Sequence, residues 1–137
     1  MTAKSKRLLG AALVAFVATG VAQPALAGPE TVSRMAGIVL RLEHFPSAEA
    51  KAQLTAIADD ERTSKAEQQV AMAIRAIEHK VNDADKAKLL AISGDDAQPV
   101  SLRMLANIVA SMNHIPDDKA KMALERLEGG KRTLKVE

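Results

Sequence analysis

Three histidines are the side chains of this sequence best suited to chemistry. His44, His79 and His114 are its only histidines, and each lies 35 residues from the next. An imidazole ring can bind a transition metal, transfer protons near neutral pH, or donate a hydrogen bond to a free backbone carbonyl. Which of these the protein uses depends on the elements that carry the three rings and on how close together those elements bring them.

The sequence around each histidine recurs with the same spacing. Alanine stands eight residues before each histidine, lysine seven residues after it and leucine ten residues after it. These columns are Ala36, Ala71 and Ala106; Lys51, Lys86 and Lys121; and Leu54, Leu89 and Leu124. Three residues after each histidine stands a residue that can cap a helix N-terminus: Ser47, Asn82 or Asp117. A fixed period of this size is typical of stacked helical hairpins.

The spacing of apolar residues predicts helices on both sides of each histidine. In the first copy, Val32, Met35, Val39 and Leu42 recur at steps of three and four and so share one helical face. Pro46 disfavours helix at the residue before it, which places a bend at the histidine. We therefore expect an all-α fold of six helices, arranged as three tandem αα-hairpin repeats of 35 residues after a cleaved signal peptide.

The second copy also contains a local signal for the start of a helix. Ser64 is followed three residues later by Glu67, which is the spacing of a capping box. In such a box each side chain accepts a hydrogen bond from the other residue's backbone N–H. A helix is therefore predicted to begin directly after Ser64.

The first 27 residues have the pattern of a secretory signal peptide. Lys4, Lys6 and Arg7 precede an apolar run over 8–22, which is shorter than the roughly 18 residues of a membrane-spanning helix. Small residues at Ala25 and Ala27 then match the positions that a signal peptidase reads. We expect cleavage after Ala27, a periplasmic or secreted location, and no transmembrane span in the mature form.

The rest of the chain is expected to form one helical repeat domain. It should cover residues 28–128, with units at about 31–65, 66–100 and 101–128, and a disordered polar tail at 129–137. The sequence contains no cysteine, so the domain has no disulfide bonds and depends on packing for its stability.

Charge and aromatic content argue against a nucleic-acid partner. The leader holds three of the 19 basic residues and none of the 17 acidic ones, so 16 basic and 17 acidic residues follow it. Nucleic-acid binding calls for a basic face, which this balance does not supply. Beyond the leader Phe45 is the only aromatic residue, so a stacking platform for bases is also absent from the sequence.

The histidines allow three interpretations. In the first they are structural, because a ring N–H at the end of a helix can bond a free carbonyl. In the second they bind a metal; neighbouring hairpins in a stack lie about 8–10 Å apart, so three rings reach one ion only if the array curls tightly. The third is a response to pH. The sequence alone assigns no metal site and no cofactor to the protein.

No catalytic motif is recognisable in the sequence. There is no cysteine nucleophile, no His-Glu-x-x-His motif and no glycine-rich phosphate loop. The repeated lysines Lys51, Lys86 and Lys121 form either a solvated face or a contact surface for a partner. We predict a non-enzymatic protein-interaction module of the bacterial envelope that binds another protein or peptide. The alternative is a metal- or pH-responsive envelope protein that uses the repeated histidines.

Overall fold

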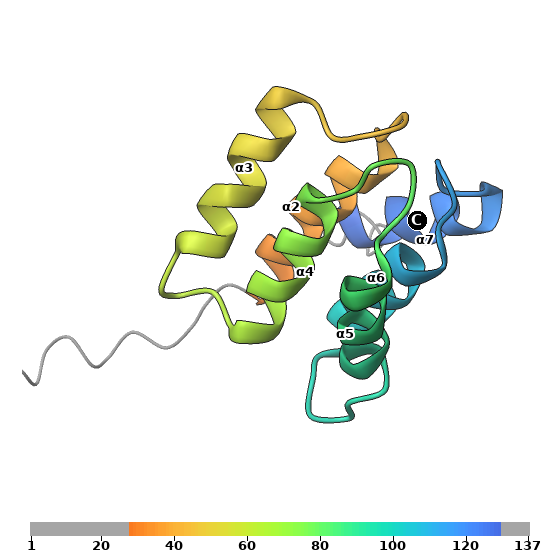
Figure 1. Cartoon of the computed structure of the whole chain (residues 1–137). Coiled ribbons are helices and arrows are strands. Elements are labelled where there is room, and N and C mark those ends of the chain that lie inside the picture. Colours follow the sequence, from red (N-terminus) through yellow and green to blue (C-terminus); the bar gives the residue numbers. More distant parts are fainter. Residues whose placement is uncertain (1–27, 130–137) are drawn as a thin grey trace, which may run out of the picture.

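The computed structural model describes residues 28–129, which form six α-helices and no β-strand. The predicted all-α fold with six helices is therefore confirmed for this part of the chain. The helices are α2 (Gly28–Leu40), α3 (Ala48–Asp59), α4 (Lys65–Arg75), α5 (Asp83–Ser93), α6 (Val100–Ser111) and α7 (Asp118–Glu128) (Figure 1). The expected signal peptide and the polar tail beyond Gly129 lie outside the described residues.

None of the six helices combines the length and the apolar character that crossing a lipid bilayer requires.

The predicted capping residues stand at the starts of α3, α5 and α7. The side chains of Ser47, Asn82 and Asp117 each accept a hydrogen bond from the backbone N–H three residues later, at 3.1, 2.8 and 2.8 Å. These bonds satisfy N–H groups that have no partner within the helix. The predicted capping box is also confirmed: Ser64 Oγ accepts from Glu67 N at 3.2 Å, and Glu67 Oε2 accepts from Ser64 N at 3.0 Å.

The helices pair differently from the hairpins that the sequence led us to expect. The most extensive packing is between α3 and α4, between α5 and α6, and between α2 and α7. The helices on either side of a histidine touch much less. The expectation of hairpins centred on the histidines is therefore wrong. The reason is that the histidine segments (41–47, 76–82 and 112–117) do not fold back into tight turns but run beside one another, joined by backbone hydrogen bonds from His79 to His44 and from His114 to His79.

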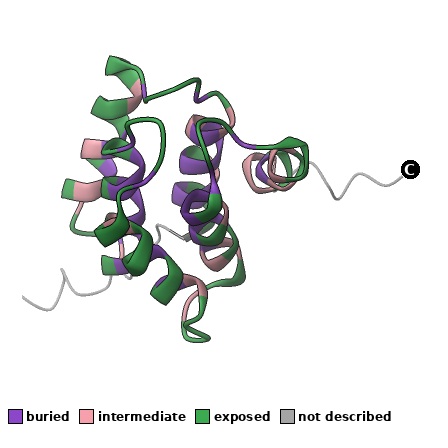
Figure 2. Ribbon diagram, turned by 45° about the vertical axis from the view of Figure 1, so that its right-hand side comes forward, coloured by how far each residue is buried: buried purple, intermediate pink, exposed green. Residues whose placement is uncertain are grey.

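Three helices form the centre of the fold. α2, α4 and α6 contact one another. Outside them, α3 packs against α4, α5 packs against α6, and α7 packs against α2. The buried residues line the inner faces of the ribbons in Figure 2. The repeated alanines of the central helices and the repeated leucines of the outer helices are all fully buried. The residue types that recur every 35 positions are thus the ones that fill the interior, apart from the histidines and lysines.

The last helix packs against the first, so the six helices form a closed set. Ser33 Oγ donates to the backbone carbonyl of Glu128 at 2.7 Å, and Arg41 Nη2 lies 2.6 Å from Glu128 Oε1. Gly37 leaves room for this contact, because a Cβ atom there would lie only 2.7 Å from Glu128 Oε1. The open stack that the repeat suggested is consequently replaced by a ring.

The other two close pairs have a similar polar contact, in which the donor side chain stands at the same register. Gln68 Nε2 donates to the carbonyl of Asp60 at 3.1 Å between α4 and the end of α3. Arg103 Nε donates to the carbonyl of Ser93 at 3.1 Å between α6 and the end of α5. Ser33, Gln68 and Arg103 lie 35 residues apart. The contact that closes the ring is therefore of the same kind as those inside it.

Closure of the ring can be tested in α7. We predict that Leu124→Ala lowers the free energy of unfolding by roughly 2–5 kcal/mol, because Leu124 is 0% exposed and its removal leaves a cavity. Met122→Ala, two residues earlier and 56% exposed, is the matched control and should cost less than about 1 kcal/mol. Urea denaturation followed by circular dichroism measures both. Equal, small effects would mean that α7 does not belong to the folded core.

Candidate functional site at the three histidines

The backbones of the three histidines join the connecting segments to one another. His79 N donates to the carbonyl of His44 at 3.0 Å, and His114 N donates to the carbonyl of His79 at 2.7 Å. The corresponding bond between His44 N and the carbonyl of His114 is not formed in the described structure. All three segments lie at one end of the molecule, and the α3–α4 and α5–α6 loops lie away from it (Figure 1). Residues far apart in the sequence are thereby held side by side.

The three imidazole rings form a triangle. The ring centroids of His44 and His79 are 5.7 Å apart, those of His79 and His114 are 5.3 Å apart, and those of His44 and His114 are 6.2 Å apart. All three residues are exposed. The helix-to-helix spacing of about 8–10 Å expected for a stack is therefore not the spacing of the rings. The imidazoles are closer because the six helices form a closed set and the three histidine segments lie at one end of it.

Two of the histidines have a backbone conformation that L-residues rarely adopt. The φ angle is 73° at His79 and 72° at His114. At His114 the N–H of Ile115 also donates to the carbonyl of Asn113 at 2.9 Å, which makes a γ-turn of the rare positive-φ type. Such a conformation costs roughly 1–2 kcal/mol for a residue other than glycine. Strain of this size is often found at functional sites.

The rings do not cap helix ends as the structural interpretation expected. Among the described residues, the only hydrogen bond of a histidine ring is between His114 Nδ1 and the side-chain oxygen of Asn113, at 3.1 Å. Nor do the rings form a finished metal site: no group of three or more His, Asp or Glu side chains within 28–129 is arranged to hold an ion. The cluster is a set of neighbouring, exposed and mostly unbonded imidazoles.

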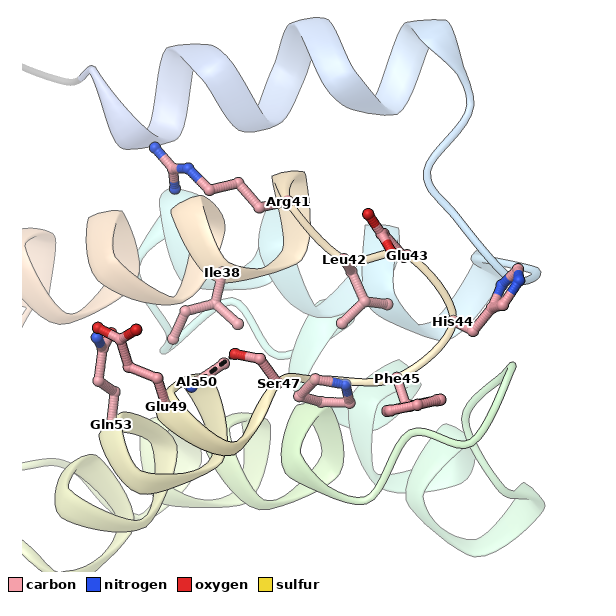
Figure 3. Close-up of a pocket in the computed structure, with 11 residues that line it drawn as sticks. Ile38, Arg41, Leu42, Glu43, His44, Phe45, Ser47, Glu49, Ala50 and Gln53 are labelled. Carbon is pink, nitrogen blue, oxygen red and sulfur yellow. Dashed lines mark hydrogen bonds between the residues drawn. The ribbon is translucent and has the colours of Figure 1, made fainter.

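A groove lies beside the cluster, along the segment that joins α2 to α3. It encloses about 590 Å³ between the end of α2 and the start of α3 (Figure 3). Ile38, Leu42 and Phe45 give it an apolar lining, and Arg41 and Glu43 add charges. In Figure 3 the His44 side chain lies at the tip of this segment, at the opposite end from Ile38.

A second hollow lies between the first and third histidine segments. It encloses about 460 Å³ and is lined by residues that include Glu43, His44, Ile115 and Lys121. This is the side of the triangle where the backbone bond between histidine segments is not formed and where the ring separation is largest, 6.2 Å. The cluster is therefore open on this side.

The three repeated lysines do not share one environment. Lys51 and Lys86 are exposed and line neither hollow. Lys121 is half-buried, lines the second hollow with His44, and places its Nζ 3.9 Å from Asp118 Oδ1. Of the three candidate partner contacts, Lys121 is the one that the fold brings to the edge of the histidine cluster.

Sequence reasoning missed two apolar residues beside the histidines. Phe45 is 60% exposed and Ile115 is 46% exposed, although both are large and apolar. A signal was present: each stands directly before a proline, which disfavours helix at that position and so keeps the residue out of the packed face of a helix. Pro46 and Pro116 are buried, so the preceding residue faces solvent.

The strained backbone at His79 has a measurable consequence. We predict that the His79→Gly variant is more stable than His79→Ala by about 1 kcal/mol, because glycine adopts a positive φ without strain. At His44, whose φ is not positive, the order should be reversed, with His44→Gly less stable than His44→Ala. Thermal and urea unfolding of the four variants measure the difference. The same order at both positions would contradict the strained conformation.

Comparison with known proteins gives no relative: no protein-family model, curated protein or solved structure matches this chain.

Proposed function

We propose that this protein is an exported, non-enzymatic helical module that binds another protein through the end where the histidines lie. The observation that carries the proposal is the exposure of Phe45 and Ile115 beside the two hollows at this end. Large apolar side chains that face solvent next to a concave surface are typical of protein-binding sites. This surface, called the histidine face below, consists of the three histidines, Phe45, Ile115 and the linings of both hollows.

The lining of the larger groove indicates what kind of partner segment fits. Ile38, Leu42 and the exposed Phe45 line this groove, so an apolar side chain of the partner would lose water-exposed surface there. Arg41 and Glu43 line the same groove and offer polar contacts of both signs. The proposed ligand is therefore a peptide segment with an apolar anchor residue flanked by polar residues.

The three connecting segments contribute differently to the histidine face. The residue after the histidine is Phe45 in the first segment, Lys80 in the second and Ile115 in the third. The apolar contacts therefore come from the first and third segments, on either side of the second hollow. A partner that recognises this face can bind in one orientation only, because turning it around the cluster would place an apolar anchor against Lys80.

We also propose that the fold consists of three tandem copies of one 35-residue unit. The proposal is supported by burial at matching positions. Ala36, Ala71 and Ala106, and likewise Leu54, Leu89 and Leu124, are all 0% exposed. The unit is a central helix, a connecting segment that holds the histidine and an outer helix, and the outer helix packs on the central helix of the next unit.

A metal-responsive role for the histidines is the second candidate function. It is favoured by the ring separations of 5.3–6.2 Å, which place three imidazoles around one small volume. The two functions use different residues of the histidine face. Partner binding uses the apolar side chains, and metal binding uses the rings.

Partner binding can be tested with a photo-crosslinking amino acid. We predict that a crosslinker at position 45 captures a protein of the periplasm or secreted fraction in living cells. The matched control is position 90, where Leu90 is 48% exposed and lines neither hollow. Mass spectrometry identifies the captured protein, and the purified partner should then bind the wild-type chain at least about tenfold more tightly than Ile115→Ala or Phe45→Ala, since an apolar anchor in a core contact is worth more than 1 kcal/mol. Equal capture at both positions, or equal binding by the variants, would refute the proposed surface.

The proposed export of the protein can be tested separately. Cleavage after Ala27 would leave all six helices whole, because α2 begins at Gly28. We expect the protein recovered from the periplasm or the medium to begin at Gly28, as measured by mass spectrometry of the intact chain. Replacing Ala27 by a bulky residue should block processing. Recovery of the uncleaved chain from the cytoplasm alone would contradict export.

A further inference from the structure

We infer that His44, His79 and His114 together bind one divalent transition-metal ion, with each imidazole contributing one nitrogen. Imidazole is a preferred ligand of zinc, copper and nickel, whereas magnesium and calcium prefer oxygen ligands. The inference goes beyond the proposed partner binding and does not depend on it, because it rests on the rings and not on Phe45 or Ile115. Zinc is the ion we use as the probe.

The separations of the rings fit a shared ion. A ligand nitrogen lies about 2.0–2.1 Å from zinc, and the ring centre lies about another 1.1 Å further out. Two imidazoles on one tetrahedral zinc ion therefore have centroids about 5 Å apart, and three imidazoles that share one ion have centroids at most about 5.5 Å apart on average. The three observed separations are 5.3, 5.7 and 6.2 Å. The closest pair is near the tetrahedral value, and the widest pair, His44 and His114, must move slightly closer for all three rings to reach one ion.

The remaining change is a rotation of the histidine side chains that brings the rings slightly closer and turns their nitrogens inward. As they stand, the described residues present no finished set of three ligands, so the imidazole nitrogens have to turn towards a common point. The rings are exposed, and the one hydrogen bond that restrains a ring is that of His114 with Asn113. Rotation of exposed side chains is fast and meets little steric resistance. The metal-free protein is thus close to the bound geometry without holding it.

The backbone fixes the part of the geometry that rotation cannot supply. The hydrogen bonds from His79 N to His44 O and from His114 N to His79 O hold the three Cα atoms at neighbouring places. The positive φ angles of His79 and His114 maintain this arrangement at a cost in backbone strain. A site that is organised before its ligand arrives loses less entropy on binding.

The surroundings suit an exposed ion with one open position. Glu43 and Glu78 directly precede two of the histidines and are exposed carboxylates, while Lys80 and Lys121 carry positive charge near the same face. Arg41 also lines the second hollow, so acidic groups are not in surplus there and the imidazoles would provide the affinity. Because the rings face solvent, a three-histidine zinc ion would keep its fourth position for water or for a group of a partner.

The test is calorimetric titration of the whole chain, purified without a histidine tag, with zinc chloride. We expect one ion per chain at micromolar or tighter affinity. His44→Asn, His79→Asn and His114→Asn should each weaken binding by more than about tenfold, as expected for loss of a ligand. Asparagine is the suitable replacement because it tolerates the positive φ of His79 and His114. Lys80→Asn, at an exposed neighbour of His79, is the matched control and should bind as the wild type does.

Further measurements separate a shared site from other outcomes. Circular dichroism should show that the three asparagine variants remain folded, and cobalt(II), in place of zinc, should give the visible absorption of an ion with nitrogen ligands in the wild type alone. Absence of binding at micromolar free zinc overturns the inference. So does unchanged binding in the triple variant, or dependence on only one or two of the histidines.

Discussion

The packing of α7 against α2 is the constraint on which the rest of the structure depends. The two helices come from opposite ends of the described chain, and the hydrogen bond from Ser33 to Glu128 spans 95 residues. This packing covers one face of α2 and accompanies the burial of Leu124 in α7, two surfaces that an open array would leave exposed to water. In the described structure the first and last helices cover each other.

The geometry of the histidines follows from this closure. In an open stack, residues 35 positions apart would be displaced along one axis, and the first and third would be the most distant pair. In the closed set of helices all three histidines are neighbours, and the imidazole centroids of His44 and His114 are only 6.2 Å apart. The regular spacing in the sequence therefore produces a cluster. Its consequence for function is that the three imidazoles can act together on one ligand.

Local features of the fold could be predicted from the sequence, and long-range ones could not. The caps at Ser47, Asn82 and Asp117 depend on residues three positions away, so their side chains identify them directly. The pairing of helices depends instead on the path of the connecting segments, and the sequence does not state whether such a segment folds back tightly. The positive φ angles of His79 and His114 were also unpredictable, because nothing marks a histidine in the sequence as strained.

The pattern of burial along the connecting segments explains how one end of the molecule can offer two kinds of contact. In the first segment Leu42 and Pro46 are buried and anchor the backbone, so His44 and Phe45 between them face solvent. An ion held by all three rings would join the first and third segments, which no backbone hydrogen bond between histidines joins now. Those segments form the second hollow and carry Phe45 and Ile115. Ligation of the rings would therefore fix the relative position of the two apolar side chains that the proposed partner contacts, and this gap would couple the two proposed functions physically.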